Sequence, residues 1–250
     1  MALYKTEGVV LNHRELGETD KILTLFTLEK GKLHAVARGV RRPRNPLIAG
    51  TLIFSRSNFL IVEGKNLDIL VQSEIIDSHS KLRSDLKRMA YGAYFSELIR
   101  ISTPERNKNE KLYNFFLKML HFLEEYEELE ILARCFEIKL LSIQGYTPQL
   151  TQCVTCGANK SMQFYLSSLF GGLICENCKE KDKNSKKLSR ESISFLLALL
   201  YSPIEKTQFL KIDYSFLKEI EEALTSFIED IFDKKIRTYK FLDAVRNLKA

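Results

Sequence analysis

Four of the five cysteines in this chain of 250 residues lie in one segment, as two C-x2-C pairs that eighteen residues separate: Cys153, Cys156, Cys175 and Cys178. Each pair can form a turn that points both thiolates at one centre, and two such turns make the tetrahedral four-sulfur site typical of structural zinc. Two disulfides, or four cysteines packed as small apolar side chains, are the alternatives. Because four protein ligands leave no open position for water, we expect one Zn²⁺ per chain in a structural role.

The residues around these cysteines fit a small zinc module. Residues 164–166 and 169–174 predict two short strands joined by a bend at Gly171-Gly172. The following residues, 179–190, hold six basic side chains against two acidic ones. We expect them to form a solvated linker and a second strip that can contact phosphate. The fifth cysteine, Cys135, lies in an apolar pattern and is expected in the core.

The composition favours a globular protein with an anionic partner. Hydrophobic residues make up 45% and charged residues 28% of the chain, and the net charge is +6. No stretch of about 18 apolar residues is present, and the first residues lack the apolar core of a secretory signal, so we expect no membrane association. Cysteines of the metal-binding kind, with one left over, suit a reducing cytosol, and we expect a cytoplasmic protein.

The N-terminal region predicts a small barrel or a curled sheet, because about five short apolar runs with turns between them occupy the first 75 or so residues. The predicted strands cover residues 7–11, 21–28, 33–38, 51–54 continuing to 58–62, and 67–71. Closing the sheet would remove its exposed edges. Three rings, those of Phe26, Phe54 and Phe59, could stack on bases, but we expect them in the core.

The charges of this region are one-sided. Between Gly31 and Val62 there is no Asp or Glu, and the basic side chains are Lys32, Arg38, Arg41, Arg42, Arg44 and Arg56. Residues 39–46 contain a glycine and two prolines, which predict a mobile loop rather than a helix or a central strand. A solvated turn is the alternative. Because no acidic residue balances these cations, we expect them to contact the phosphates of single-stranded nucleic acid.

From residue 82 onward the apolar period becomes helical. Stripes ending before Pro104, over 112–123 and over 129–143 predict three helices, and Gly145 predicts the end of the third. The third helix carries apolar residues on both faces, so we expect it at the centre of a bundle. Further stripes over 193–200 and 216–231 and a basic amphipathic segment over 234–248 complete the chain.

Motifs of common enzyme classes are absent. The sequence contains no G-x-x-x-x-G-K-[ST], G-x-G-x-x-G, H-E-x-x-H or G-x-S-x-G motif. Its four histidines form no recognisable nucleophilic arrangement with a cysteine or a serine. We therefore expect a binding protein rather than an enzyme.

With these features laid out, the chain resembles the RecO family of bacterial recombination mediators. Four short stretches carry the resemblance, in the family's order and along the whole chain: Gly17-Glu18-Thr19-Asp20 with Leu25-Phe26-Thr27 and Gly31, then 37–42, then 145–150 with the first cysteine pair and Gly157, and finally 171–175 with Cys178.

The resemblance implies an α+β protein with a five-stranded OB-fold barrel, a helical domain and an inserted four-cysteine zinc finger. It implies binding of single- and double-stranded DNA, annealing of complementary strands, association with RecR, and help for RecA in replacing single-strand binding protein, which has an acidic tail. The family's basic motif corresponds to Arg38, Arg41 and Arg42. We expect the barrel at 1–80, the helical domain at 81–150 and 187–250, and the zinc module at 151–186.

Two other functions remain open from the sequence. A nuclease would need a group of carboxylates that binds Mg²⁺. A protein-interaction scaffold would use the basic face to bind an acidic tail.

Overall fold

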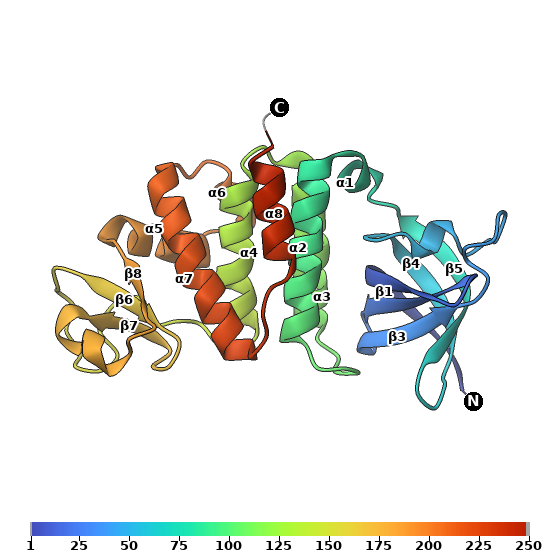
Figure 1. The fold of residues 1–250 in the computed structure, drawn as a ribbon, viewed down its shortest axis with the longest axis horizontal. Coiled ribbons are helices and arrows are strands. Elements are labelled where there is room, and N and C mark those ends of the chain that lie inside the picture. The colour runs from blue at the N-terminus through green and yellow to red at the C-terminus, as the bar shows by residue number, and fades with distance from the viewer. Residues whose placement is uncertain (1, 249–250) are drawn as a thin grey trace. The chain divides into compact units, whose positions relative to one another are not determined.

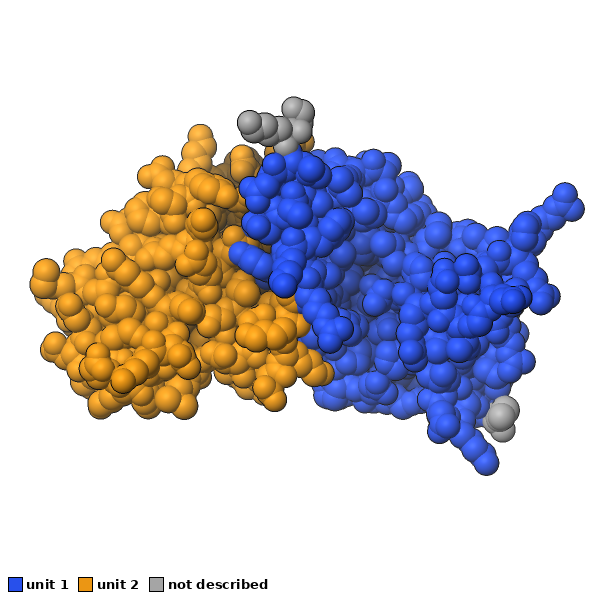
Figure 2. All heavy atoms as spheres, viewed as in Figure 1, with its two compact units in different colours: residues 1–125, 237–250 blue, residues 126–236 orange. Residues whose placement is uncertain are grey.

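A computed structural model describes residues 2–248 of the chain (Figure 1). The chain divides into two compact units, one of residues 1–125 with 237–250 and the other of residues 126–236 (Figure 2). Within the described residues, no helix is both long enough and apolar enough to cross a membrane.

The first unit begins with a closed five-stranded barrel. Its strand order is β1-β2-β3-β5-β4, and β4 pairs back onto β1. All pairs are antiparallel except β3 with β5. The predicted barrel is therefore confirmed, and its Greek-key closure is that of an OB-like fold. The strands are β1 (Leu3–Leu16), β2 (Asp20–Thr27), β3 (Gly31–Ala37), β4 (Arg56–Val62) and β5 (Asp68–Asp77).

Apolar side chains of the barrel strands point both into the barrel and, at some positions, to its outer face. Leu23 and Leu25 of β2 point into the barrel core, where they pack with Phe59 of β4. The residue after Leu25, Phe26, points outward, yet it is fully buried. Its ring packs against the rings of Tyr113 and Phe116 of α3 (Glu110–Glu125). Helix α3 therefore covers the outer face of β2 at this point.

One predicted strand is wrong in its first part: its continuation over 58–62 lies in β4, but residues 51–54 form no strand. Thr51 ends a short 3-10 helix, η1 (Ala49–Thr51), and Phe54 has a φ of 68°, a left-handed conformation that a strand does not contain. The Phe54 ring is fully buried, and a Cβ added to Gly92 would lie 2.8 Å from its Cζ atom. Packing against this glycine holds the backbone of Phe54 in a conformation that costs about 1–2 kcal/mol. All three phenylalanines of the barrel region are thus core residues, as predicted.

Helices α1 (Ser80–Ser84), α2 (Leu86–Ser102), α3 and α8 (Thr238–Arg246) complete the first unit. The side chain of Asp85 caps α2 by accepting a hydrogen bond from the Arg88 amide at 2.9 Å. The last helix, α8, is fastened to α2: the carboxylate of Glu97 accepts from the Thr238 amide at 2.6 Å, and Arg246 Nε donates to the Tyr91 hydroxyl at 2.9 Å.

The second unit packs four helices beside a small sheet. The helices are α4 (Leu129–Ile143), α5 (Arg190–Tyr201), α6 (Ile204–Thr207) and α7 (Tyr214–Phe232). The sheet has the order β7-β6-β8, from β6 (Phe164–Ser167), β7 (Gly172–Cys175) and β8 (Lys186–Leu188). Helix α4 is buried on both faces, as predicted, and Cys135 lies in its core.

The chain leaves α4 at Gly145, as predicted. Gly145 has a φ of 84°, its amide donates to the Ser142 carbonyl at 3.2 Å, and the Tyr146 amide donates to the Leu141 carbonyl at 2.8 Å. This pair of bonds is a Schellman motif, which needs a left-handed residue at the position of the glycine. The turn directs the chain from the helical part of the unit into the cysteine segment.

Candidate metal centre and nucleic-acid interface

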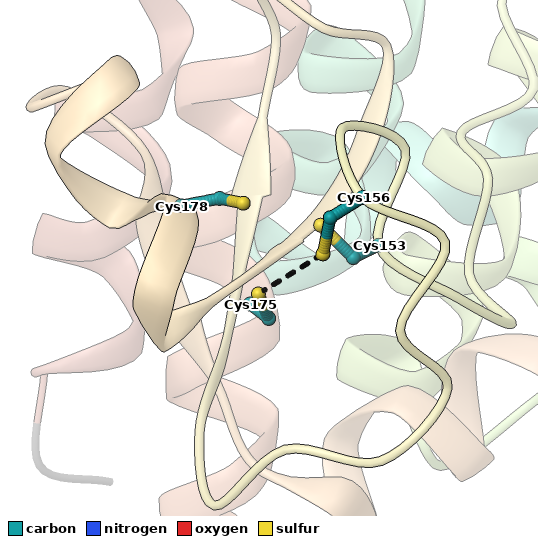
Figure 3. A group of neighbouring side chains, drawn as sticks. All are labelled: Cys153, Cys156, Cys175 and Cys178. Atoms are coloured by element: carbon teal, nitrogen blue, oxygen red, sulfur yellow. Dashed lines mark hydrogen bonds between the residues drawn. The ribbon is translucent and has the colours of Figure 1, made fainter.

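The four cysteines of the two C-x2-C pairs come together in the second unit. Cys153 and Cys156 lie on the loop before β6, Cys175 ends β7, and Cys178 lies in the 3-10 helix η2 (Glu176–Lys181). Figure 3 shows their sulfur atoms facing a common centre. The antiparallel pairing of β6 with β7 brings the second pair back to the first.

The spacing of the sulfur atoms fits one tetrahedral cation. All four Sγ atoms lie within 4.8 Å of one another, and Cys156 Sγ is 3.6 Å from Cys175 Sγ. Sulfurs bound at about 2.3 Å in a tetrahedron lie about 3.8 Å apart, whereas a disulfide needs about 2.05 Å. The cysteines are free thiols in this structure, which does not support the disulfide alternative. The four cysteines can hold a metal ion.

Backbone amides favour the thiolate form of one of these cysteines, Cys153. Burial raises the pKa of Cys153, but backbone N–H groups of Cys175, Cys156 and Thr155 directed at its sulfur bring the pKa down to about 6. Burial and then the neighbouring sulfurs raise the pKa of Cys178 to about 12. Without a cation the thiols compete for one negative charge, and a divalent ion at the centre would remove that competition.

The two glycines of the Gly171-Gly172 bend are required for different physical reasons. Gly171 has a φ of 70° and open space around it, so it supplies the left-handed conformation of the hairpin turn. A Cβ added to Gly172 would instead lie 2.6 Å from the carbonyl oxygen of Gln149. The second glycine is therefore needed because the segment that leads to Cys153 passes directly against β7.

The basic loop, which we define as residues 38–47 after β3, is a series of hydrogen-bonded turns. The Arg42 amide donates to the Gly39 carbonyl at 2.9 Å, and Asn45 Nδ2 donates to the Arg38 carbonyl at 3.1 Å. Val40 and Leu47 are buried in the barrel core. The expectation of a mobile loop is therefore corrected, because two apolar anchors and an asparagine hold it on the barrel.

The β1–β2 turn fastens the same loop from the side. The Arg41 amide donates to the Thr19 carbonyl, and the Gly39 amide donates to Asp20 Oδ1 at 2.8 Å. The Gly39 N–H, followed by the Thr19 hydroxyl, holds the pKa of Asp20 below its usual range. Asp20 therefore keeps its charge and its hold on the loop at neutral pH.

The basic side chains proposed from the sequence fall into three groups. Arg38, Arg42 and Arg44 are exposed, and within residues 2–248 none of them forms an ion pair. Arg41 is paired with Glu15 at 3.0 Å, and Arg56 is paired with Glu7 at 2.8 Å. A phosphate group would have to displace a carboxylate from each of the last two, so the unpaired arginines are the more available cations.

Lys32 is removed from the proposed DNA contacts. Its side chain is buried, with 7% exposed, and its Nζ donates to the carbonyls of Arg100 at 2.7 Å and Thr103 at 2.5 Å. These carbonyls lie at the C-terminal end of α2, where a cation is favourable. Lys32 thus joins the barrel to a helix end, and its charge does not reach the surface.

The predicted linker at 179–190 is largely structured. Lys179 donates to the carbonyls of Asp182 and Lys183 and so holds the turn after η2, and residues 186–188 form β8. The remaining basic residues of the segment are exposed: Lys181, Lys183, Lys186, Lys187 and Arg190.

Sequence reasoning missed the residues that position the basic loop. Asn45 organises its turns and Asp20 anchors it from another strand. Asn before Pro is a recognisable turn signal. No local pattern identifies Asp20 as a partner of Gly39, because the contact exists only once β1, β2 and β3 are aligned.

Comparisons with known proteins identify the family of the chain. Two family models match: "Recombination protein O N terminal" over residues 1–79 and "Recombination protein O C terminal" over residues 83–240. A protein of Symbiobacterium thermophilum named "DNA repair protein RecO" is 37% identical, with 99% of each chain covered. The protein of that name from Alkaliphilus metalliredigens is 38% identical, with 90% of this chain and 92% of its own length covered.

Both family models follow in order along one chain, and the relatives align with nearly its whole length. The barrel, the helical part and the cysteine cluster are therefore parts of one protein type, and the chain is a member of the RecO family of DNA repair proteins.

Proposed function

We propose that this protein is a recombination mediator without covalent chemistry of its own. It binds single- and double-stranded DNA, anneals complementary strands, and together with RecR helps RecA to replace single-strand binding protein. The observation that carries the proposal is the group of unpaired arginines, Arg38, Arg42 and Arg44, on an anchored loop at the barrel surface. Arg41, which the family motif includes, contributes after exchange of Glu15 for a phosphate.

Annealing has a simple physical account in these terms. Two DNA strands repel through their phosphates, and a basic surface lowers this repulsion by replacing condensed counterions. Contacts to the backbone leave the base edges free to pair. The barrel phenylalanines are buried, so in our proposal the loop holds DNA through charge and not through stacking on these rings.

The cysteine site holds one structural Zn²⁺ in this proposal. Four sulfur ligands with no oxygen or nitrogen donor favour zinc, and a closed tetrahedral site leaves no position for a substrate. The ion would supply cross-links between the loop before β6 and the end of β7. The zinc module at 151–186 is then a stabilised insertion in the helical domain, at 81–150 and 187–250, and the barrel at 1–80 binds DNA.

The remaining parts of the proposal rest on membership of the family. RecR and the acidic tail of single-strand binding protein are partners whose contact residues we do not assign. The protein works in the cytoplasm and joins the nucleoid during repair.

Salt-dependent DNA binding tests the proposal. Replacing Arg38, Arg42 and Arg44 by Ala should weaken binding of a single-stranded oligonucleotide and reduce the slope of log affinity against log salt by about two, because each lost phosphate contact is worth about 0.7. Annealing of complementary oligonucleotides without ATP should slow in parallel.

The matched control replaces Lys65, Lys81 and Lys87, three exposed lysines of the same unit, by Ala. An equal loss in both variants would show that total charge, and not the loop, binds DNA. Strand cleavage that EDTA abolishes, unaffected by the arginine substitutions, would instead identify the nuclease alternative.

A further inference from the structure

The second unit carries a basic hollow away from its cysteine site. Strand β8 and helix α7 line a cavity of about 390 Å³, into which they bring Lys186, Lys187 and Lys218. Two acidic residues, Glu219 and Glu222, line it as well. Its ability to bind an anion depends on how many of these charges are already paired.

The three lysines are unpaired and one of the two acids is engaged elsewhere. All three lysine side chains are exposed, and none forms an ion pair within residues 2–248. Glu219 accepts from the Ser189 amide at 2.8 Å and from the Ser189 hydroxyl at 2.7 Å. Its carboxylate therefore holds the N-terminal turn of α5, so that Glu222 is the remaining acidic residue among three lysines that line the hollow.

Regular structure fixes the origins of these side chains. Lys186 and Lys187 lie opposite Leu166 and Tyr165 in the β6–β8 pairing, and Lys218 lies on the first turns of α7. Lysines of a strand and of a helix thus line one hollow. Lysine binds phosphate as a point charge and does not select bases, so the arrangement suits a nucleic-acid backbone.

We propose that this hollow binds the phosphate backbone of a second DNA strand, independently of the basic loop on the barrel. The inference rests on the proposed annealing function, which requires both strands to be held by protein. Each chain then holds one strand on the arginines and the other on the lysines, and because the contacts are to the phosphates, the bases of both strands stay free to pair.

The number of strands bound per chain tests this inference directly. The full-length protein is mixed with an excess of oligothymidylate of about eight nucleotides, a length within the range that one site covers, and the complexes are weighed by native mass spectrometry. Thymidylate cannot pair with itself, so two oligonucleotides on one chain mean two sites. We expect two per chain for the wild type.

Three variants locate the sites. Lys186→Ala, Lys187→Ala and Lys218→Ala combined should leave one oligonucleotide per chain and abolish annealing. The combined loop variant of Arg38, Arg42 and Arg44 should also leave one, and joining both sets should leave none. Replacing the three lysines by Arg keeps the charge and should retain two.

A matched control removes the same charge elsewhere in the unit, by Ala substitution of the exposed Lys206, Lys211 and Lys234, and should retain two oligonucleotides. Unchanged melting temperatures establish that all variants are folded. Two oligonucleotides on the lysine variant, or one on the wild type that the loop substitutions remove, would overturn the inference while the DNA-binding function stands. No DNA on the wild type would reject both.

Discussion

The cysteine cluster and the basic loop are built from the same kind of local structure, but their side chains point in opposite directions. In both, a left-handed glycine and a few backbone hydrogen bonds hold a turn: Gly157 after the first cysteine pair, and Gly39 in the basic loop. The cysteine turns point their side chains inward at one centre, whereas the arginines of the loop point into solvent. In our proposal, the closed set of sulfur ligands stabilises the protein, and the open set of cations is available to a partner.

This comparison predicts that the two regions respond differently to substitution. Changes at the cysteine cluster should alter stability and leave the salt dependence of DNA binding intact. Changes at the loop arginines should do the reverse. The following predictions test this separation, from the largest expected effect to the smallest.

Removing one ligand should have the largest effect. Cys153→Ala should abolish metal binding and lower the stability of the second unit by on the order of 5 kcal/mol or more, since metal binding is coupled to folding. Elemental analysis and thermal unfolding provide the measurements. Cys135→Ala, a buried cysteine outside the cluster, should keep one metal per chain. A metal-free wild type that melts unchanged would contradict the prediction.

Lys32→Met should cause the second largest loss of stability, although Lys32 lies in the same basic stretch as the arginines. It leaves two helix-end carbonyls without their donor, which costs roughly 3 kcal/mol, and urea unfolding should report this loss. The salt slope of DNA binding should stay at the wild-type value once the protein is folded. A reduced slope at unchanged stability would return Lys32 to the DNA contacts.

Gly172→Ala should destabilise the cysteine module by about 2 kcal/mol, because its Cβ collides with the backbone at Gln149. Gly171→Ala is the matched control. It has open space around it and loses only about 1 kcal/mol from its left-handed backbone. Thermal unfolding of both variants measures the difference, and an equal effect would place the close approach to Gln149 in doubt.

Acid should weaken the hydrogen bond between Asp20 and the Gly39 amide, which holds the basic loop. The pKa of Asp20 is lowered in the folded protein, mainly by the Gly39 N–H. Its contribution is therefore fully present above the unfolded value of about 3.9 and is lost as the pH falls through the lower folded value. The protection of the Gly39 amide against hydrogen exchange, relative to its intrinsic exchange rate at each pH, should decrease across this window. Asp20→Asn should remove the pH dependence, and a wild-type response in that variant would contradict the assignment.

The local sequence pattern was sufficient to predict much of the fold, because the apolar residues of the barrel strands and of the helices recur at the period of each element. It failed where a contact between distant segments decides the structure. Phe54 looks like a strand residue until Gly92 accepts its ring. Arg134 looks like a surface residue of α4, yet it is buried and pairs with Glu137 at 2.8 Å and with Glu221 at 3.2 Å.

The sequence by itself determined the cluster of four cysteines that can hold a metal ion, the barrel, the position of the basic loop and the family. Spacing and periodicity encode these features, since both cysteine pairs and all apolar stripes are local patterns. Only the tertiary structure decided which cations are free. The ammonium groups of Lys32 and Lys179 are occupied by backbone carbonyls, at the end of α2 and in the turn after η2. Arg41 and Arg56 are paired with carboxylates on β1. Charge is a property of the residue, but its availability depends on what the fold places beside it.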